Sequence, residues 1–457
     1  MNIAVIGAGI MGRYTARALA LSPQVQQVCL YDKKLETDIN FIGELEKFLS
    51  ANGDLENSRD YSIQSSVRSA VNYADILLFC VETDNVGEAM REVLPYARRG
   101  AIISGQTSRK TPEAEVFDDY VGQNPDSGLE MVSIHTLCNP SSSDPSKQIL
   151  GIIRHRASDA SYRKAYDLFS CMSENISEFE SVDEHDTTMA HTQINTSKTW
   201  LSIASSFARA GRFPWIDGVY GSGMDAMKFA MALRAAKAAP HIYRNIQLGS
   251  PHGKSIVEHS AQVEYELFRL IVGDNKEEYR RRCMDAKEAL YGSRSGNPML
   301  SDGEVQSFGN GNHVLPNSHF SIMQYAVSSA ENPDKRRRNL FADLRGTTPM
   351  HTSLILLADY LFNNQELLED AINAPFGNPK LRSDDLVFHD EIQGWSDAVF
   401  FDNSAGFNAR HKKMTGTLDS RVVGEQSEKS SEIVRLGTEA LSRAKMSGRI
   451  EELLETA

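Results

Sequence analysis

The chain opens with an apolar run, Ile3-Ala4-Val5-Ile6, close to its first residue. A short run of β-branched and other apolar residues, without polar alternation, is typical of a strand that is buried on both faces. Residues 13–21 follow with Ala16, Leu19 and Ala20 spaced along one helical face, which predicts a helix. A strand buried on both faces needs helices on both sides, so this pattern favours a parallel sheet.

Similar apolar runs recur over the first 182 residues and alternate with helical patterns. The alternation predicts an α/β fold whose first domain, residues 1–182, is a Rossmann-type, doubly wound parallel sheet. Further strands are expected at residues 25–31, 76–81, 101–104, 130–134, 150–153 and 176–179.

Helical periodicity dominates from about Asp183 onward, as in the recurrence of Met224, Met227 and Met231. We therefore expect a mostly α-helical substrate and dimerisation domain over residues 183–411. Residues 291–316 are rich in Gly, Ser, Asn and Pro, which predicts a long loop. Residues 412–457 are expected to form a polar linker followed by an exposed amphipathic helix at 431–454.

Composition narrows the classes of protein to which the chain can belong. Its 457 residues are 41% hydrophobic and carry a net charge of -13, which argues against nucleic acid as a partner. The basic run at residues 335–338 is then expected to be a solvated loop. Five cysteines without paired spacing predict reduced thiols and no metal site. With no signal peptide and no apolar run long enough for a membrane span, a soluble, cytoplasmic protein is expected.

A glycine-rich turn separates the first strand from its helix. Gly7, Gly9 and Gly12 stand at the spacing of the dinucleotide-binding fingerprint, with Ile10 and Met11 between the last two. In this position the glycines permit a tight turn and a close approach of pyrophosphate to the helix N-terminus. These five residues are therefore the expected contacts to the phosphates of NAD or NADP.

The second strand ends at Asp32, twenty residues after Gly12, where an acid can accept hydrogen bonds from the adenine ribose. Asp32 alone favours NAD, whereas the neighbouring Lys33 and Lys34 can neutralise a 2'-phosphate and favour NADP. Val81 and Glu82 follow the strand at 76–81 and are expected to border the cofactor.

Two later strands end in polar residues that a core would exclude. The strand at 101–104 is followed by Ser108 and Lys110, and the strand at 130–134 runs directly into His135. Ligands of open parallel sheets lie beyond the carboxyl ends of the strands, so these side chains indicate a reaction site. In the alternative interpretation, Ser108 only caps the next helix and His135 is a hydrogen-bonded loop residue. Cys138 lies nearby, where packing is its more common role.

Spaced motifs along the chain resemble those of the prephenate dehydrogenase family, in particular its long fungal-type branch. The turn from Gly105 to Lys110 resembles the family's Gly-x-x-Ser-x-Lys turn, and Ser133-Ile134-His135 matches its strand-end histidine. The similarity extends from Met1 to about Trp395 through Glu184-His185-Asp186, Phe213-Pro214-Trp215, Pro316-Asn317-Ser318-His319 and Asp384-Asp385-Leu386.

Residues 234–246 are similar to a family run that begins at a substrate-binding arginine. By this resemblance Arg234 binds a carboxylate of the substrate, and Lys110 and Tyr243 are further substrate-binding residues. One departure is the segment at 193–197, Gln-Ile-Asn-Thr-Ser, where family members commonly carry Ser-His-Leu-Pro-His.

The resemblance implies oxidative decarboxylation of prephenate to 4-hydroxyphenylpyruvate in tyrosine biosynthesis, by a homodimer that uses NADP. A neutral His135 suits this reaction because the substrate hydroxyl must lose a proton as hydride leaves. Ser108 can orient the imidazole or the nicotinamide amide.

Three other functions stay open. Arogenate differs from prephenate by an amino group in place of a keto group, so an arogenate dehydrogenase is a close rival. A β-hydroxyacid dehydrogenase would place a lysine in a glycine-rich helix, and Lys198 follows a segment without glycines. A non-catalytic NADP-sensing protein should have lost the strand-end histidine or the carboxylate ligand.

Overall fold

The chain divides into two compact units, Met1–Met189 and Ala190–Ala457. The computed structural model describes residues 1–50, 61–137, 149–210, 223–292, 297–309, 317–334, 338–377, 379–418 and 420–454. Cys138, the Phe-Pro-Trp motif at 213–215 and residues 335–337 of the basic run lie outside the described residues. The first unit ends at 189 rather than 182, because the helix that starts at Val182 packs against the last two strands of the sheet.

The first unit holds a sheet of eight described strands in the order β3-β2-β1-β4-β5-β6-β7-β8. All neighbouring pairs are parallel except β6 and β7, which are antiparallel. The first six strands have the Rossmann order, which confirms the predicted α/β fold class. The strands are β1 (Asn2–Ile6), β2 (Gln27–Tyr31), β3 (Tyr61–Ile63), β4 (Ile76–Phe79), β5 (Ile102–Gly105), β6 (Glu130–Thr136), β7 (Ile149–His155) and β8 (Asn175–Phe179).

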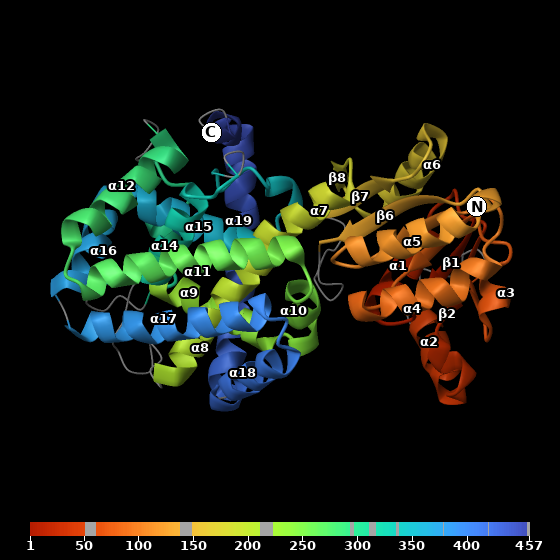
Figure 1. Cartoon of the computed structure of the whole chain (residues 1–457), viewed down its shortest axis with the longest axis horizontal. Helices are drawn as coiled ribbons and strands as arrows, with labels where there is room; N and C mark the ends of the chain where they lie inside the picture. Colours follow the sequence, from red (N-terminus) through yellow and green to blue (C-terminus); the bar gives the residue numbers. More distant parts are fainter. Residues whose placement is uncertain are drawn as a thin grey trace. The chain divides into compact units, whose positions relative to one another are not determined.

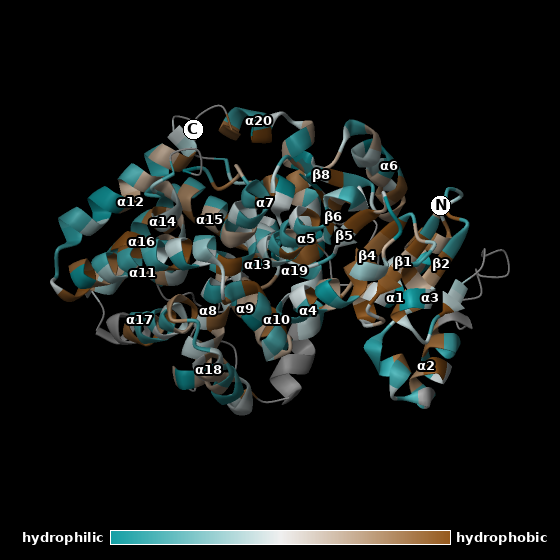
Figure 2. Cartoon of the chain, turned by 45° about the vertical axis from the view of Figure 1, so that its right-hand side comes forward, coloured by the Kyte–Doolittle hydropathy of each residue, from teal (hydrophilic) through white to brown (hydrophobic). Residues whose placement is uncertain are grey.

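Helices cover both faces of this sheet, as the apolar strands require (Figure 1). Ile3 and Val5 of β1 point to one face, whereas Ala4 and Ile6 point to the other, and all four are buried. Figure 2 shows the hydrophobic residues gathered in β1 and β4. The first face is covered by α1 (Ile10–Ala20), α2 (Ile39–Ser50) and α6 (Asp159–Phe169), and the second by α3 (Val67–Val71), α4 (Thr83–Val93) and α5 (Thr111–Gln123).

The second unit is helical, as predicted. Its core includes the fully buried Trp200 and Trp395, together with the methionines at 224, 227 and 231. After α7 (Val182–Met189), which closes the first unit, and a π-helix (Ala190–Asn195), the described helices are α8 (Thr196–Ala210), α9 (Gly223–Lys237), α10 (Pro240–Gln247), α11 (Pro251–Val272), α12 (Lys276–Tyr291), α13 (Asp302–Gln306), α14 (Phe320–Ala330), α15 (Pro349–Asn363), α16 (Gln365–Gly377), α17 (Pro379–Phe400), α18 (Ser404–Thr417), α19 (Ser420–Met446) and α20 (Arg449–Leu454).

The last 46 residues differ from the expected linker and exposed helix (457 against 411). Helix α18 continues to Thr417, and α19 packs against α9 and α15. Ile433, Ala440 and Ala444 are buried in the helical core, so the apolar stripe of α19 covers the core instead of facing solvent. Within the expected loop at 291–316, α13 forms because Ser301 and Glu304 make a capping box.

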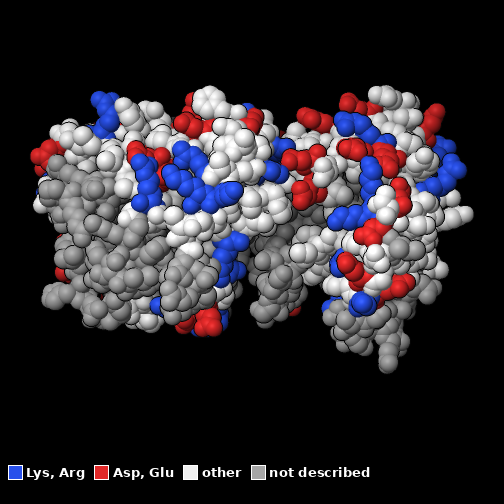
Figure 3. Space-filling view, turned by 90° about the horizontal axis from the view of Figure 1, so that it is seen from below, with Lys and Arg blue, Asp and Glu red and all other residues white. Residues whose placement is uncertain are grey.

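The surface carries both signs of charge. On the face drawn in Figure 3, basic and acidic side chains of the described residues are interspersed over both units. Among the described residues, no helix is long and apolar enough to cross a membrane. Over the same residues, no group of three or more His, Cys, Asp or Glu side chains is arranged to hold a metal ion.

Candidate active site

The glycine-rich turn between β1 and α1 has the geometry of a phosphate site. Gly7 has a φ of 102°, and a Cβ on Gly12 would lie 1.8 Å from the carbonyl oxygen of Gly7. A Cβ on Gly9 would meet nothing within 4 Å, so open space lies in front of the helix. Helix α1 starts without a side-chain cap, which leaves its first N–H groups available to a pyrophosphate. Ile10, 71% exposed, and the half-buried Met11 form its first turn.

Asp32 lies at the end of β2, beside this turn. Its Oδ2 accepts a hydrogen bond from the backbone N–H of Ala8 at 2.7 Å, and its Oδ1 accepts one from Lys34 N–H at 3.0 Å. The residues after β4 border the same turn, since a Cβ on Gly7 would lie 3.0 Å from Val81 Cγ1 and Glu82 is the N-cap of α4. The described residues here therefore fit an NAD or NADP dinucleotide.

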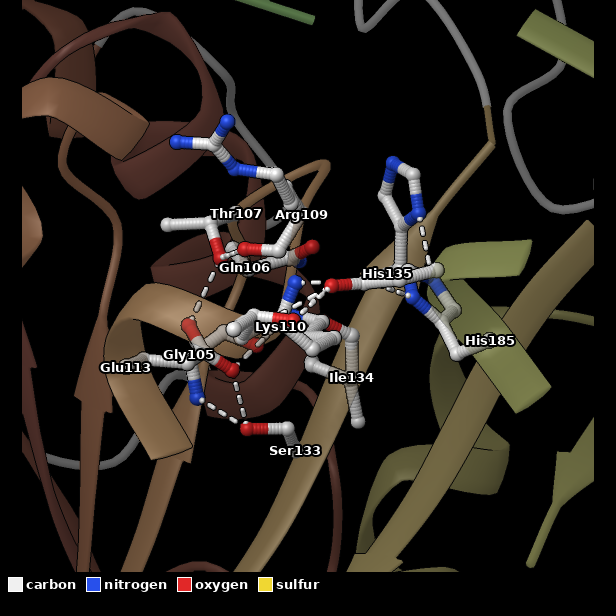
Figure 4. Close-up of polar contacts among 12 residues, drawn as sticks. Gly105, Gln106, Thr107, Arg109, Lys110, Glu113, Ser133, Ile134, His135 and His185 are labelled. Atoms are coloured by element: carbon white, nitrogen blue, oxygen red, sulfur yellow. Dashed lines mark hydrogen bonds and ion pairs between the residues drawn. The ribbon is translucent and has the colours of Figure 1, made fainter. Parts of the chain in front are cut away.

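The ends of β5 and β6 are joined by a buried lysine (Figure 4). Lys110 Nζ donates to the carbonyl oxygens of Gly105 at 2.9 Å and Ile134 at 2.8 Å, and it forms an ion pair with Glu113 at 3.1 Å. Both side chains of this pair are fully buried. Three partners occupy the three N–H donors of the ammonium group, so none is left for a substrate carboxylate. Lys110 therefore has a structural role in place of the substrate-binding role expected from the sequence.

Glu113 extends this network under the turn that follows β5. Its carboxylate accepts hydrogen bonds from the hydroxyls of Thr107 and Ser133. A Cβ on Gly105 would lie 2.0 Å from Glu113 Oε2, so only glycine fits beneath the carboxylate. The adjacent Gln106 donates from Nε2 to the hydroxyl of Thr136 at 2.8 Å, which ties the turn to the residue after His135.

His135 belongs to a chain of three buried polar side chains. Its Nδ1 lies 3.0 Å from Nε2 of His185, and Nδ1 of His185 lies 2.8 Å from Oδ1 of Asp186. In Figure 4 the ring of His135 faces His185 through one nitrogen and turns the other away from it. His135 Nε2 makes no hydrogen bond to a described residue.

These contacts determine the proton positions on both imidazoles. Asp186 accepts the N–H at His185 Nδ1, which leaves Nε2 of His185 as an acceptor. His135 must then donate from Nδ1, so its Nε2 carries a free lone pair. Burial, with the nearby positive charges of His185 and Lys110, lowers the pKa of His135 well below 6.5. The arrangement presents a neutral imidazole that can accept a proton at Nε2.

Asp186 also starts helix α5. Its carboxylate accepts hydrogen bonds from the backbone N–H groups of Lys110 at 2.8 Å and Thr111 at 2.9 Å, and from the Thr111 hydroxyl at 2.6 Å. Burial alone would raise the pKa of Asp186, but the hydrogen bonds from His185, Lys110 and Thr111 hold it below its usual value. Asp186, and not Ser108, caps α5.

Ser108 is half-buried in the turn after β5 and makes no hydrogen bond to a described residue. Because His185 already occupies Nδ1 of His135, the structure assigns the orientation of the imidazole to His185 rather than to Ser108. The hydroxyl of Ser108 thus stays available to a ligand.

Two expected substrate residues lie in the helical unit. Arg234, near the end of α9, is half-buried, and no carboxylate of a described residue lies within ion-pair distance of it. Its one described hydrogen bond is a long one, 3.5 Å, from Nη1 to the hydroxyl of Ser430. Asp225, the structural partner considered for it, pairs with Lys228 at 2.8 Å. Burial raises the pKa of Tyr243 to about 12, against the opposing charge of Arg234.

The segment that departs from the family pattern lies in and after the π-helix. Gln247 donates from Nε2 to the hydroxyl of Ser197 at 2.7 Å. The side-chain oxygens of Gln193, Asn195 and Gln247 are buried and have no hydrogen-bond partner among the described residues. About nine in ten buried polar groups are paired, and π-helices are frequent at functional sites, so this segment is a second candidate contact region.

The family can now be stated from the helical unit. A family model described as a 6-phosphogluconate dehydrogenase C-terminal domain matches residues 194–438, which is more than half of the chain. The chain belongs to this family.

Two relatives cover most of the chain's length. The chain is 25% identical over 406 residues to "Probable prephenate dehydrogenase [NADP(+)]" of Schizosaccharomyces pombe, covering 87% of this chain and 89% of the relative. It is 27% identical over 372 residues to "Prephenate dehydrogenase [NADP(+)]" of Saccharomyces cerevisiae, covering 78% of each.

Solved structures also resemble the chain, at lower similarity. Prephenate dehydrogenase from A. aeolicus matches with 17% identity and a TM-score of 0.43, over 62% of this chain and 94% of that chain. Mycobacterium tuberculosis 3-hydroxyisobutyrate dehydrogenase matches with 14% identity and a TM-score of 0.35, over 54% and 91%.

Sequence reasoning missed the roles of His185 and Asp186, although both belong to a motif that it noted. They lie 50 residues from His135 along the chain, and no periodicity links the two positions. The available signal was a histidine and an acid side by side after the last strand, where a parallel sheet can bring them to the strand ends.

We expect Lys110→Met to lower the free energy of unfolding by about 3–5 kcal/mol, because Glu113 would stay buried without its cation. Urea denaturation followed by circular dichroism measures this change. Lys34→Met, on the exposed surface, should change it by less than about 0.5 kcal/mol. A Lys110→Met protein of normal stability with a raised KM for substrate would restore the substrate-binding role.

Proposed function

We propose that this chain is an NADP-dependent prephenate dehydrogenase of tyrosine biosynthesis. The observation that carries the proposal is the His135–His185–Asp186 chain, which presents a neutral imidazole where β6 ends, in the same sheet as the glycine-rich turn. Both relatives that cover most of the chain are named prephenate dehydrogenase [NADP(+)]. The reaction converts prephenate to 4-hydroxyphenylpyruvate and CO2.

His135 acts as the base. The bound nicotinamide accepts the hydride that leaves C4 of prephenate. Nε2 of His135 accepts the proton of the C4 hydroxyl, and Nδ1 keeps its hydrogen bond to His185 as the imidazole becomes charged. The ring carboxylate then leaves as CO2, because its departure makes the ring aromatic. The phenolate oxygen of the product takes the proton back from His135, so the base is regenerated.

His185 and Asp186 are positioning residues in this proposal. The Asp186 carboxylate stabilises positive charge that spreads from His135 to His185, since its own pKa is held low. The pair also fixes the tautomer in which His135 Nε2 is the acceptor.

The helical unit supplies the substrate contacts. Arg234 is a planar, two-pronged donor without a carboxylate partner among the described residues, which suits it to a carboxylate of prephenate. Tyr243 and Ser108 are proposed as neutral donors. We also propose that the enzyme is a homodimer in the cytoplasm, which light scattering and cell fractionation would test.

The β-hydroxyacid dehydrogenase alternative requires an available lysine on the helix after the sheet. Lys198 is fully buried in α8 and donates to the hydroxyl of Ser260 in α11 at 2.8 Å. Burial lowers its pKa to about 7. The position of Lys198 inside the helical core disfavours a catalytic role.

Steady-state assays with prephenate and arogenate, each with NADP and NAD, test the function. We expect NADP reduction with prephenate, and 4-hydroxyphenylpyruvate as the product identified by mass spectrometry. Faster turnover of arogenate would identify an arogenate dehydrogenase. Tight NADP binding without turnover of either substrate would instead support a sensing protein.

Replacing His135 by Asn should lower kcat by about 10²–10⁴-fold, the usual contribution of a positioned base, and change KM little. Rapid mixing and steady-state assays measure both. His155→Asn is the matched control, because His155 pairs with Met131 at the opposite end of the same strand ladder. Near-normal kcat in the His135 variant would contradict the assignment.

The pH profile should reflect the lowered pKa of His135. Because the neutral imidazole is the active form, kcat/KM should persist as the pH falls below 6.5 and decline only through the lower pKa. A series of assays from acid to neutral pH, with enzyme stability checked at each pH, tests this. An acidic limb centred at or above 6.5 would show that another group controls the rate.

Arg234→Gln should raise the KM for prephenate by roughly ten-fold or more, because losing one member of a desolvated charge pair costs about 2–5 kcal/mol. The affinity for NADP and the melting temperature should stay close to wild type. Lys237→Gln is the matched control, since Lys237 is exposed in the last turn of the same helix. Early melting with joint loss of cofactor and substrate affinity would make Arg234 a structural residue.

A further inference from the structure

Three cations surround the end of β2, and the structure separates them by their partners. They are Lys33 and Lys34, which follow Asp32, and Arg13, which lies in the first turns of α1. The sequence marked only the two lysines as candidates for a 2'-phosphate. Their contacts point to a different pair.

Lys33 is directed toward α4 and its acids. Nζ of Lys33 lies 3.2 Å from Glu88 and 3.8 Å from Glu92. The hydrogen bond to Glu88 and the charge of Glu92 raise the pKa of Lys33. A second anion near this lysine would have to compete with two carboxylates already present.

Arg13 is held over the glycine-rich turn with its terminal nitrogens available. Nε donates to the carbonyl oxygen of Ala8 at 2.8 Å, which fixes the direction of the side chain. The guanidinium carbon lies 5.5 Å from the ring centroids of Phe41 and of Phe48 in α2. No carboxylate of a described residue forms an ion pair with Arg13, and its Nη atoms make no hydrogen bond within the described chain.

Lys34 shares the aromatic neighbour of Arg13. Its Nζ lies 5.5 Å from the ring centroid of Phe41, and among the described residues it has no acidic partner. Phe41 therefore has both cations within cation–π distance, one from α1 and one from the segment after β2. Because both contacts converge on this one ring, the two cations lie at the same end of β2.

Asp32 determines what this pair can bind. Both of its carboxylate oxygens accept backbone N–H groups, from Ala8 and Lys34, so Asp32 stabilises the turn itself. A 2'-phosphate beside this carboxylate is repelled unless cations offset the charge, and a guanidinium binds phosphate through two parallel N–H donors.

We propose that Arg13 and Lys34, joined through Phe41, bind the 2'-phosphate of NADP, and that Lys33 does not. This inference rests on the proposed use of NADP and names the residues that select it. The adenine end of the cofactor requires no prephenate, so the inference can be tested independently of the reaction.

Calorimetric binding of 2',5'-ADP and 5'-AMP to the full chain tests the assignment. The wild type should bind 2',5'-ADP more tightly than 5'-AMP. Arg13→Gln, which keeps a donor for the Ala8 carbonyl, should weaken 2',5'-ADP binding by roughly 10- to 100-fold and leave 5'-AMP binding unchanged. Lys34→Gln should have a smaller effect in the same direction, because Lys34 is exposed.

Lys33→Gln is the matched control and should leave the preference for 2',5'-ADP intact. An equal loss in Lys33→Gln and Arg13→Gln would overturn the assignment. Equal weakening of both ligands in Arg13→Gln would also overturn it, because Arg13 would then support only the turn. Turnover of prephenate by the wild type is scored separately, so an enzyme that binds 2',5'-ADP as described and ignores prephenate would contradict only the proposed reaction.

Discussion

The carboxylate of Asp186 is the group on which the site depends. It accepts four hydrogen bonds, from the backbone of Lys110, the backbone and hydroxyl of Thr111, and the ring of His185. These contacts begin helix α5 and set the tautomer of His185 at the same time. Since His185 in turn receives the N–H of His135, the start of a structural helix and the acceptor nitrogen of the base are determined by one buried charge.

A second buried charge holds the two strand ends at a fixed separation. Lys110 links Gly105 of β5 to Ile134 of β6, and Glu113 balances its charge. Burying such a pair without further hydrogen bonds is unfavourable, and here two carbonyls and two hydroxyls complete the coordination. The pair thus makes the backbone around His135 rigid, which is what a base needs when its reach to the substrate is one hydrogen bond.

At the cofactor end, local charge is again used to shape the backbone. Asp32 was expected to contact the ribose, and in the structure its oxygens bind the N–H groups of Ala8 and Lys34. Lys33, expected to face a phosphate, pairs with acids of α4. Both differences have one cause: strand and turn residues that are neighbours in sequence point to different sides, and their partners come from other elements.

Local signals in the chain were enough to predict the order of elements, the glycine turn and the position of His135. These features follow from apolar periodicity and from the need for glycine at close backbone contacts, which act over a few residues. Folding was needed to reveal that Lys110 is buried, that Asp186 caps α5 from 75 residues away, and that the C-terminal helix covers the core. Those outcomes depend on which side chains meet in three dimensions, and a buried charge is tolerated only where its partners arrive from distant parts of the chain.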